Sequence, residues 1–454
     1  MTNDLTRGNP VKLILFFTIP YLIGNVFQLL YNAADTFIVG RTLGVNALAA
    51  VGATGGLVWF AMGFVQGVCT GFSVITAQCF GSGDKENLKK SFSMSIILSV
   101  ILAAIITLGC TLCARLLLEL INTPPEIIDV SYLYMFILFA GLPATTMYNL
   151  LSNEIRALGN SKTPLMFLII ASVINIALDF VFILVFKTGA QGAGYATVIA
   201  QLASGVMCIV YLVKKVPELH LTKAHFALDY PMMKKLVRVG LPMGLLNMIL
   251  SIGVITMQWA TNRISTQAVA TYTAASRLEQ FGNLTLQSFG ASVSVYAAQN
   301  YGAGDIKRVR RGVNSCMGMS MIWVAIAVVI MAVFGKSLIR LFVGADATGQ
   351  IISDGYAYIV ISAVLMVFLA PLIIYKSVVQ ALGRAFIPTI SGFVEVVCRA
   401  GVAMFLAAQY GFIALCFASP SAWLGALVLI APEYFVLMRR LSKKYEQQSE
   451  VLSV

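Results

Sequence analysis

The chain has 454 residues, of which 59% are hydrophobic and only 11% are charged, and its mean hydropathy is +0.86. Soluble domains carry about 25% charged residues, so this composition excludes a soluble globular protein and predicts a membrane-embedded one. The net charge of +12 does not indicate a nucleic-acid partner, because no soluble basic domain is present. We expect contact with anionic membrane lipids instead.

Twelve apolar segments are each long enough to cross a bilayer, which takes about 20 helical residues. They cover residues 13–40, 50–79, 91–119, 130–156, 164–186, 192–213, 236–261, 268–300, 312–334, 354–381, 387–409 and 413–438. The first segment is too long for a cleaved signal peptide and carries Pro20 and Asp35, so we expect it to be retained. The sequence therefore predicts an all-α polytopic membrane protein.

The two halves of the chain repeat one another. The segment AQCFGSGD at 77–84 returns as AQNYGAGD at 298–305, an offset of 221 residues. Pro20 and Arg41 return as Pro242 and Arg263, which we interpret as structural or hinge positions. Six spans per copy give both copies the same orientation, so we expect a pseudo-twofold axis along the membrane normal. The predicted domains are a bundle of residues 1–213, a linker of 214–235, a second bundle of 236–440 and a tail of 441–454.

The repeated segment itself has a local structural interpretation. It lies between two spans, where glycine permits a tight turn and the final aspartate can cap the next helix. We therefore interpret it as scaffold.

Basic residues predict the orientation. With the amino terminus inside, 22 of the 31 Lys and Arg residues lie in the inner segments and six lie in the outer ones. This excess predicts that both termini are cytoplasmic.

Two acids stand inside the spans of the first copy, where charge is costly and marks ion or substrate paths. Asp35 lies roughly 9 Å and Asp179 roughly 12 Å from the outer end of its span, while Thr197 lies roughly 8 Å deep. Asn175 is one helical turn before Asp179. These four oxygen-bearing residues can therefore meet in the outer half of the first bundle.

Such a set is suited to a coupling ion. Two carboxylates in a low dielectric cannot both ionise cheaply, so a proton or a cation such as Na⁺ is expected between them. The alternative is that each aspartate only caps or hydrogen-bonds locally. The second copy has Met257, Arg399 and Ala403 at the equivalents of Asp35, Asn175 and Asp179, so the acid pair is not duplicated.

The second copy has its own polar residues. Glu395 and Arg399 are spaced i,i+4 and can neutralise one another, which favours a structural role. Lys376 can extend toward the membrane surface. A substrate cavity between the copies is predicted to be lined by adaptable aromatic, methionine and polar side chains. The candidates are Tyr31, Met62, Gln66, Met257, Tyr272, Glu279 and Gln287.

Catalytic, metal and nucleotide chemistry find little support. His220 and His225 are spaced i,i+5 and do not share a helix face, so we predict no metal site. The glycines at 81 and 83 are not followed by the Lys of a phosphate loop. No helical His/Glu motif or Ser/His pair occurs in the spans, so we expect no enzyme and no cofactor.

Together, these residues resemble a known family. Pro20, DTFIVGR at 35–41, the paired AQxxGxGD segments, RALG at 156–159 and Asn175 with Asp179 are similar to the multidrug and toxic compound extrusion (MATE) antiporters, and most like the bacterial MepA-type group. The resemblance covers essentially the whole chain.

The resemblance implies a secondary active transporter in the bacterial inner membrane. It would export organic cations and other amphipathic drugs by alternating access, in exchange for H⁺ or Na⁺. The family's amino-lobe cation site corresponds to Asp35, Asn175, Asp179 and Thr197. We expect a monomer.

Two alternatives remain open. The coupling ion can be H⁺ or Na⁺, because the oxygen set suits either. A lipid-linked oligosaccharide flippase of the same superfamily is the alternative function, although its cavity would want more basic residues than Arg277, Lys376 and Arg399.

Overall fold

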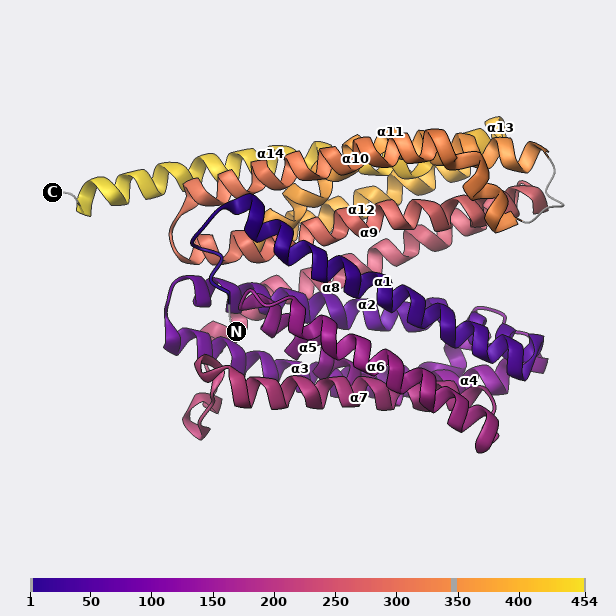
Figure 1. The fold of residues 1–454 in the computed structure, drawn as a ribbon, viewed down its shortest axis with the longest axis horizontal. Helices are drawn as coiled ribbons and strands as arrows, with labels where there is room; N and C mark the ends of the chain where they lie inside the picture. Colours follow the sequence, from indigo (N-terminus) through magenta and orange to yellow (C-terminus); the bar gives the residue numbers. More distant parts are fainter. Residues whose placement is uncertain (1–2, 344–348, 453–454) are drawn as a thin grey trace. The chain divides into compact units, whose positions relative to one another are not determined.

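The computed structural model describes residues 3–343 and 349–452, and in this part of the chain every regular element is a helix (Figure 1). The α-helices are α1 (Pro10–Leu43), α2 (Val45–Gly81), α3 (Lys85–Leu120), α4 (Pro125–Ala140), α5 (Leu142–Ala157), α6 (Lys162–Phe180), α7 (Ala190–Lys215), α8 (Tyr230–Asn262), α9 (Thr266–Gly302), α10 (Ile306–Val343), α11 (Gly349–Ala381), α12 (Phe386–Gly401), α13 (Ala407–Tyr410) and α14 (Phe412–Leu452). Short π-helical segments continue α6 at Val181–Val185 and α12 at Val402–Leu406.

The helices account for the predicted spans and identify a multi-pass membrane protein. Ten of the described helices are long and apolar enough to cross a membrane. The predicted span 130–156 is divided into α4 and α5, which are bent by 44° at Gly141 because Pro143 begins the second helix. Helix α9 corresponds to the remaining predicted span, and it is less apolar because it carries Arg277, Glu279 and many hydroxyl groups. The all-α membrane fold is confirmed.

The repeated segments form the same turn in both copies. Gly83 and Gly304 have φ angles of 73° and 78°, a left-handed conformation that glycine adopts without strain. Asp84 accepts a hydrogen bond from the backbone N–H of Asn87 at 3.0 Å, and Asp305 accepts one from that of Arg308 at 2.8 Å. The interpretation of these segments as capped turns is confirmed.

The Asp84 cap makes stability depend on pH. Hydrogen bonds from the Asn87 backbone and side chain lower the pKa of the exposed Asp84 carboxyl. The stabilisation is present above the unfolded-state pKa and is lost as pH falls through the lower folded-state pKa. We expect Asp84→Ala to cost about 1 kcal/mol and to remove this part of the acid sensitivity. Thermal unfolding across an acidic pH series checks it, and an unchanged profile would contradict it.

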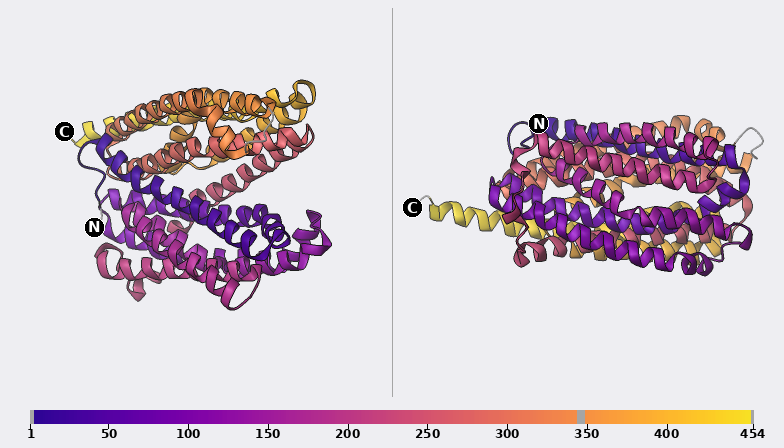
Figure 2. Two further views of the ribbon diagram at one scale, coloured as in Figure 1. Left: turned by 45° about the vertical axis from the view of Figure 1, so that its right-hand side comes forward. Right: turned by 90° about the horizontal axis from the view of Figure 1, so that it is seen from below.

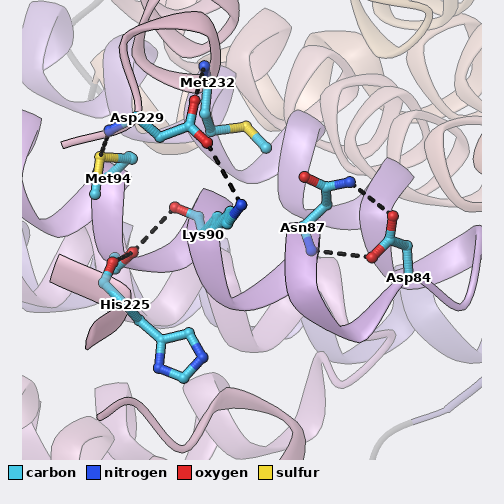
Figure 3. A network of polar contacts seen from close by, with 8 residues as sticks. Asp84, Asn87, Lys90, Met94, His225, Asp229 and Met232 are labelled. Carbon is cyan, nitrogen blue, oxygen red and sulfur yellow. Dashed lines mark hydrogen bonds and ion pairs between the residues drawn. The ribbon is translucent and has the colours of Figure 1, made fainter. Parts of the chain in front are cut away.

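The residues between α7 and α8 fold against α3 (Figure 3). The Ser93 hydroxyl donates to the backbone carbonyl of His225 at 2.7 Å, and Lys90 lies 3.8 Å from the Asp229 carboxylate. Asp229 in turn accepts a hydrogen bond from the backbone N–H of Met232 at 2.9 Å, which caps the start of α8. The linker therefore belongs structurally to the first half of the chain.

The helices form two compact units whose boundaries differ from the predicted domains. Unit 1 comprises residues 1–5 and 19–248, and unit 2 comprises residues 6–18 and 249–454. Helix α1 is nevertheless one unbroken helix (Figure 2), as is α8. The first turns of α1 thus pack within unit 2, and the first half of α8 packs within unit 1.

Small residues explain this exchange of helix ends. Gly67 and Gly71 of α2 face Gly240 and Gly244 of α8 so closely that a Cβ on Gly67 would lie 2.5 Å from the carbonyl oxygen of Met243. Glycines spaced by four allow such close backbone packing between membrane helices. Sequence periodicity identifies these helices, but it does not say which neighbour each half contacts.

The equivalent crossing in unit 2 uses hydroxyl groups. Offsets of 222 and 221 residues pair Gly240 with Thr18 and Gly71 with Ser292. The Thr18 hydroxyl donates to that of Ser292 at 2.8 Å. A glycine contact in one copy is thus a hydrogen bond in the other.

Candidate functional site

The predicted coupling residues converge within unit 1. Asp35 lies on α1, Asn175 and Asp179 lie on α6, and Thr197 lies on α7. The Asp35 and Asp179 carboxyl groups lie within short electrostatic range of one another. Two carboxylate anions repel one another in a low dielectric, so both can be charged at little cost only with a cation between them, and otherwise one of them is protonated. The arrangement is therefore chemically suited to a proton or a cation.

The two α6 residues of this cluster, Asn175 and Asp179, are buried without hydrogen-bond partners among the residues that the structure describes. Asn175 and Asp179 are completely buried. Within the described residues, no donor hydrogen-bonds either carboxyl oxygen of Asp179, and neither polar atom of the Asn175 side chain has a partner. Buried polar groups are normally satisfied, so these atoms have room for a hydrogen-bond partner such as a water molecule or an ion.

Two tyrosines complete the cluster. The Tyr31 hydroxyl donates to that of Thr197 at 3.1 Å and also lies beside Asp35. Tyr134 of α4 lies within electrostatic range of both aspartates. Tyr31 thus belongs to the polar cluster around Asp35, whereas the sequence suggests it as a cavity residue. Its place one turn before Asp35 is a signal that could have identified it, but no sequence signal points to Tyr134.

A π-helical segment follows Asp179 directly. Val181–Val185 widens the helix at this point, and π-segments inside α-helices often occur at functional sites. The equivalent segment Val402–Leu406 is also present in unit 2, where the residue two positions before it is Ala400 instead of an acid. When the two copies are aligned on these segments, the residue equivalent to Asp179 is Ala400 and not Ala403. The irregular backbone is duplicated, but the carboxyl groups are not.

The polar residues of unit 2 are largely paired with one another. The Tyr358 hydroxyl donates to Glu279 at 2.8 Å, and the Tyr272 ring packs edge-on against Tyr358. Lys376 donates to Glu395 at 2.7 Å. Glu395 is thus paired with Lys376 of α11, and among the described residues it forms no ion pair with Arg399, the partner that the sequence suggested. This contact also replaces the predicted extension of Lys376 toward the membrane surface.

The other predicted cavity residues differ in exposure. Met257 is only 1% exposed and packs in an apolar cluster with Ala260, Ala403 and Leu415, so its assignment to a cavity is wrong. Met62 is partly buried against the apolar cluster of α2, α3 and α4. Gln66 on α2 and its repeat partner Gln287 on α9 are exposed.

The repeat-related structural residues lie on the crossing helices. Pro20 lies inside α1 and Pro242 inside α8. Arg41 is in the last turn of α1, and the Arg263 guanidinium stacks 4.3 Å from the centroid of the Trp259 ring.

Comparison with known proteins places these features in a family. The family model described as MatE matches residues 20–181 and 242–405. The "Probable multidrug resistance protein YpnP" of Bacillus subtilis is 29% identical over 430 residues, covering 93% of this chain and 91% of that protein. The "Multidrug export protein MepA" of Staphylococcus saprophyticus is 19% identical, covering 74% of each.

A solved structure matches the fold over nearly the whole chain. The outward-facing conformation of a multidrug resistance MATE family transporter has a TM-score of 0.90 at 22% identity, covering 97% of this chain and 99% of that one. At this identity the likeness shows the fold alone.

Proposed function

Because the chain belongs to the MATE family, we propose that it is a secondary active multidrug efflux antiporter. It exports organic cations and other amphipathic compounds by alternating access, in exchange for H⁺ or Na⁺. The names of its relatives favour drug export over the lipid-linked oligosaccharide flippase. We place it in the bacterial plasma membrane as a monomer, with both termini in the cytoplasm.

One observation supports ion coupling above the others. Asp35 and Asp179 adjoin one another beside unpaired Asn175, and the Tyr31–Thr197 pair closes the cluster. Its oxygen atoms suit a proton or Na⁺ equally. We propose these residues as the coupling site.

Coupling follows if the ion and the drug favour different states. An ion that binds one state of the transporter more tightly than the other shifts the population toward that state. If the bound ion changes the affinity for the drug by some factor, the bound drug must change the affinity for the ion by the same factor. Gln66 of unit 1, and Gln287 and Tyr272 of unit 2, remain proposed substrate contacts, whereas Glu279 is buried and bonded to Tyr358.

The function is tested with purified protein in liposomes. Efflux of a cationic dye is measured under an imposed pH gradient and, separately, under an imposed Na⁺ gradient. We expect transport with at least one gradient and none without either, and the active gradient identifies the ion. An efflux rate that is the same with and without each gradient would contradict the proposal.

A further inference from the structure

A third acid in unit 1 is buried away from the Asp35–Asp179 pair. Glu154 of α5 is completely buried, and within the described part of the chain neither of its carboxyl oxygens has a hydrogen-bond partner. Leaving such a group unsatisfied is costly. The carboxyl group is therefore either held neutral by a proton or bound to a cation.

Hydroxyl groups from two other helices lie near this acid. Thr76 of α2 lies beside Glu154, and its hydroxyl is 3.0 Å from that of Ser91 on α3. Ser95 and Ser99 continue the same face of α3 at successive turns, and both of their hydroxyl oxygens are buried without a partner. Three mutually packed helices thus bring together the Glu154 carboxyl and the Thr76–Ser91 hydroxyl pair, with Ser95 and Ser99 in line along α3.

The other titratable groups near Glu154 are thiols of α2. Cys69 lies beside Ser99 and within electrostatic range of Glu154, and Cys79 is also within that range. The nearby Arg156 donates to Asn153 at 3.2 Å and lies over the Tyr21 ring. The Glu154 charge is therefore not balanced by a basic residue in the described structure.

The second copy shows that this packing position does not need a carboxyl group. Val378 stands at the equivalent of Glu154, and it is completely buried. The equivalents of Thr76, Ser91 and Ser95 are Ala297, Gly312 and Cys316, which are also buried. The scaffold is completed there with small and apolar residues, so the polar set in unit 1 has a role beyond packing.

Glu154 lies far from the proposed coupling site. It is three residues before the end of α5, at the end of the bundle where α2 turns into α3. Asp179 lies 17 residues into the next helix, which runs away from that end and places the two acids on the order of 20 Å apart. They cannot share one bound ion.

We propose that Glu154, with the hydroxyl groups of Thr76, Ser91 and Ser95, forms a second site for a monovalent cation, occupied by a proton or by Na⁺. A carboxylate with neutral oxygen donors matches the preference of hard cations. The site lies at the predicted cytoplasmic end of unit 1, opposite Asp35 and Asp179. Unit 1 would then have one buried acidic site toward each end of its helices.

The test measures binding rather than transport, so it is independent of the proposed function. Infrared difference spectra of the full-length Asp35→Asn/Asp179→Asn protein are recorded across pH, with Na⁺ or with choline. We expect a protonated-carboxyl band that disappears as pH rises and is lost completely on adding Glu154→Gln. A band that falls on addition of Na⁺ at fixed pH identifies a Na⁺ site, and one that responds only to pH identifies a proton site.

Two further variants keep the proposal falsifiable. Glu154→Val introduces the residue of the second copy, and it replaces the glutamine variant if that protein does not fold. Ser320→Ala removes a buried unpaired hydroxyl group of unit 2 and should leave the band unchanged. The proposal is overturned if no spectral change with pH or Na⁺ depends on Glu154, since the group is then a permanently neutral part of the core.

Discussion

Replacing Asp35 with asparagine is expected to abolish ion-driven export while the protein remains folded. The substitution keeps the side chain's shape but removes one of the two carboxyl groups of the proposed ion site. Without a bound ion the two transporter states no longer respond to the gradient, so drug efflux should fall to the level measured without one. Dye efflux from proteoliposomes, under whichever gradient drives the unmodified protein, checks this prediction.

The matched control removes an acid elsewhere in the same unit. Asp129 of α4 is exposed and lies 3.4 Å from Arg115. Such surface pairs contribute little, so Asp129→Asn should retain export and show that a lost negative charge is not sufficient. Undiminished export by Asp35→Asn would contradict the coupling assignment.

Replacing Gly71 with valine is expected to separate α2 from α8 and to destabilise unit 1. A Cβ at this position overlaps the backbone of Gly240, which cannot move aside as a flexible side chain can. Overpacking of this kind costs about 1–3 kcal/mol, and sometimes more. We expect a lower yield of folded protein and a lower thermal midpoint in detergent.

Gly109→Val is the control for this prediction. Gly109 lies within α3, and a Cβ there meets no atom within 4 Å. Both variants replace a glycine inside a helix with the same β-branched residue, so they differ only in whether the new side chain meets the backbone of a second helix. If both variants lose stability equally, helix propensity rather than the α2–α8 contact explains the loss.

The two copies together separate scaffold from function. Both retain the left-handed glycine, the aspartate cap and the π-segment. They differ at the polar groups, since only the first copy has the Asp35–Asp179 pair and the Glu154 carboxyl. Changes at the retained features should affect folding, whereas changes at the unshared acids should affect ion binding.

The sequence by itself determined the features that arise from local chemistry. Apolar length identified the membrane helices, the repeat located both capped turns, and the cost of buried charge singled out Asp35 and Asp179. Depth along a helix could be counted because each residue rises by a fixed 1.5 Å. That count correctly placed Thr197 near the acid pair, through its bond to Tyr31.

Only the tertiary structure decided how the helices are rotated and which neighbours they contact. It placed the first half of α8 against Gly67 and Gly71, paired Lys376 with Glu395, and buried Glu154 among the hydroxyl groups of α2 and α3. In helices that are apolar on nearly every side, periodicity does not mark the inward face. Small residues and long-range hydrogen bonds fix that choice, and they act only after distant segments have come together.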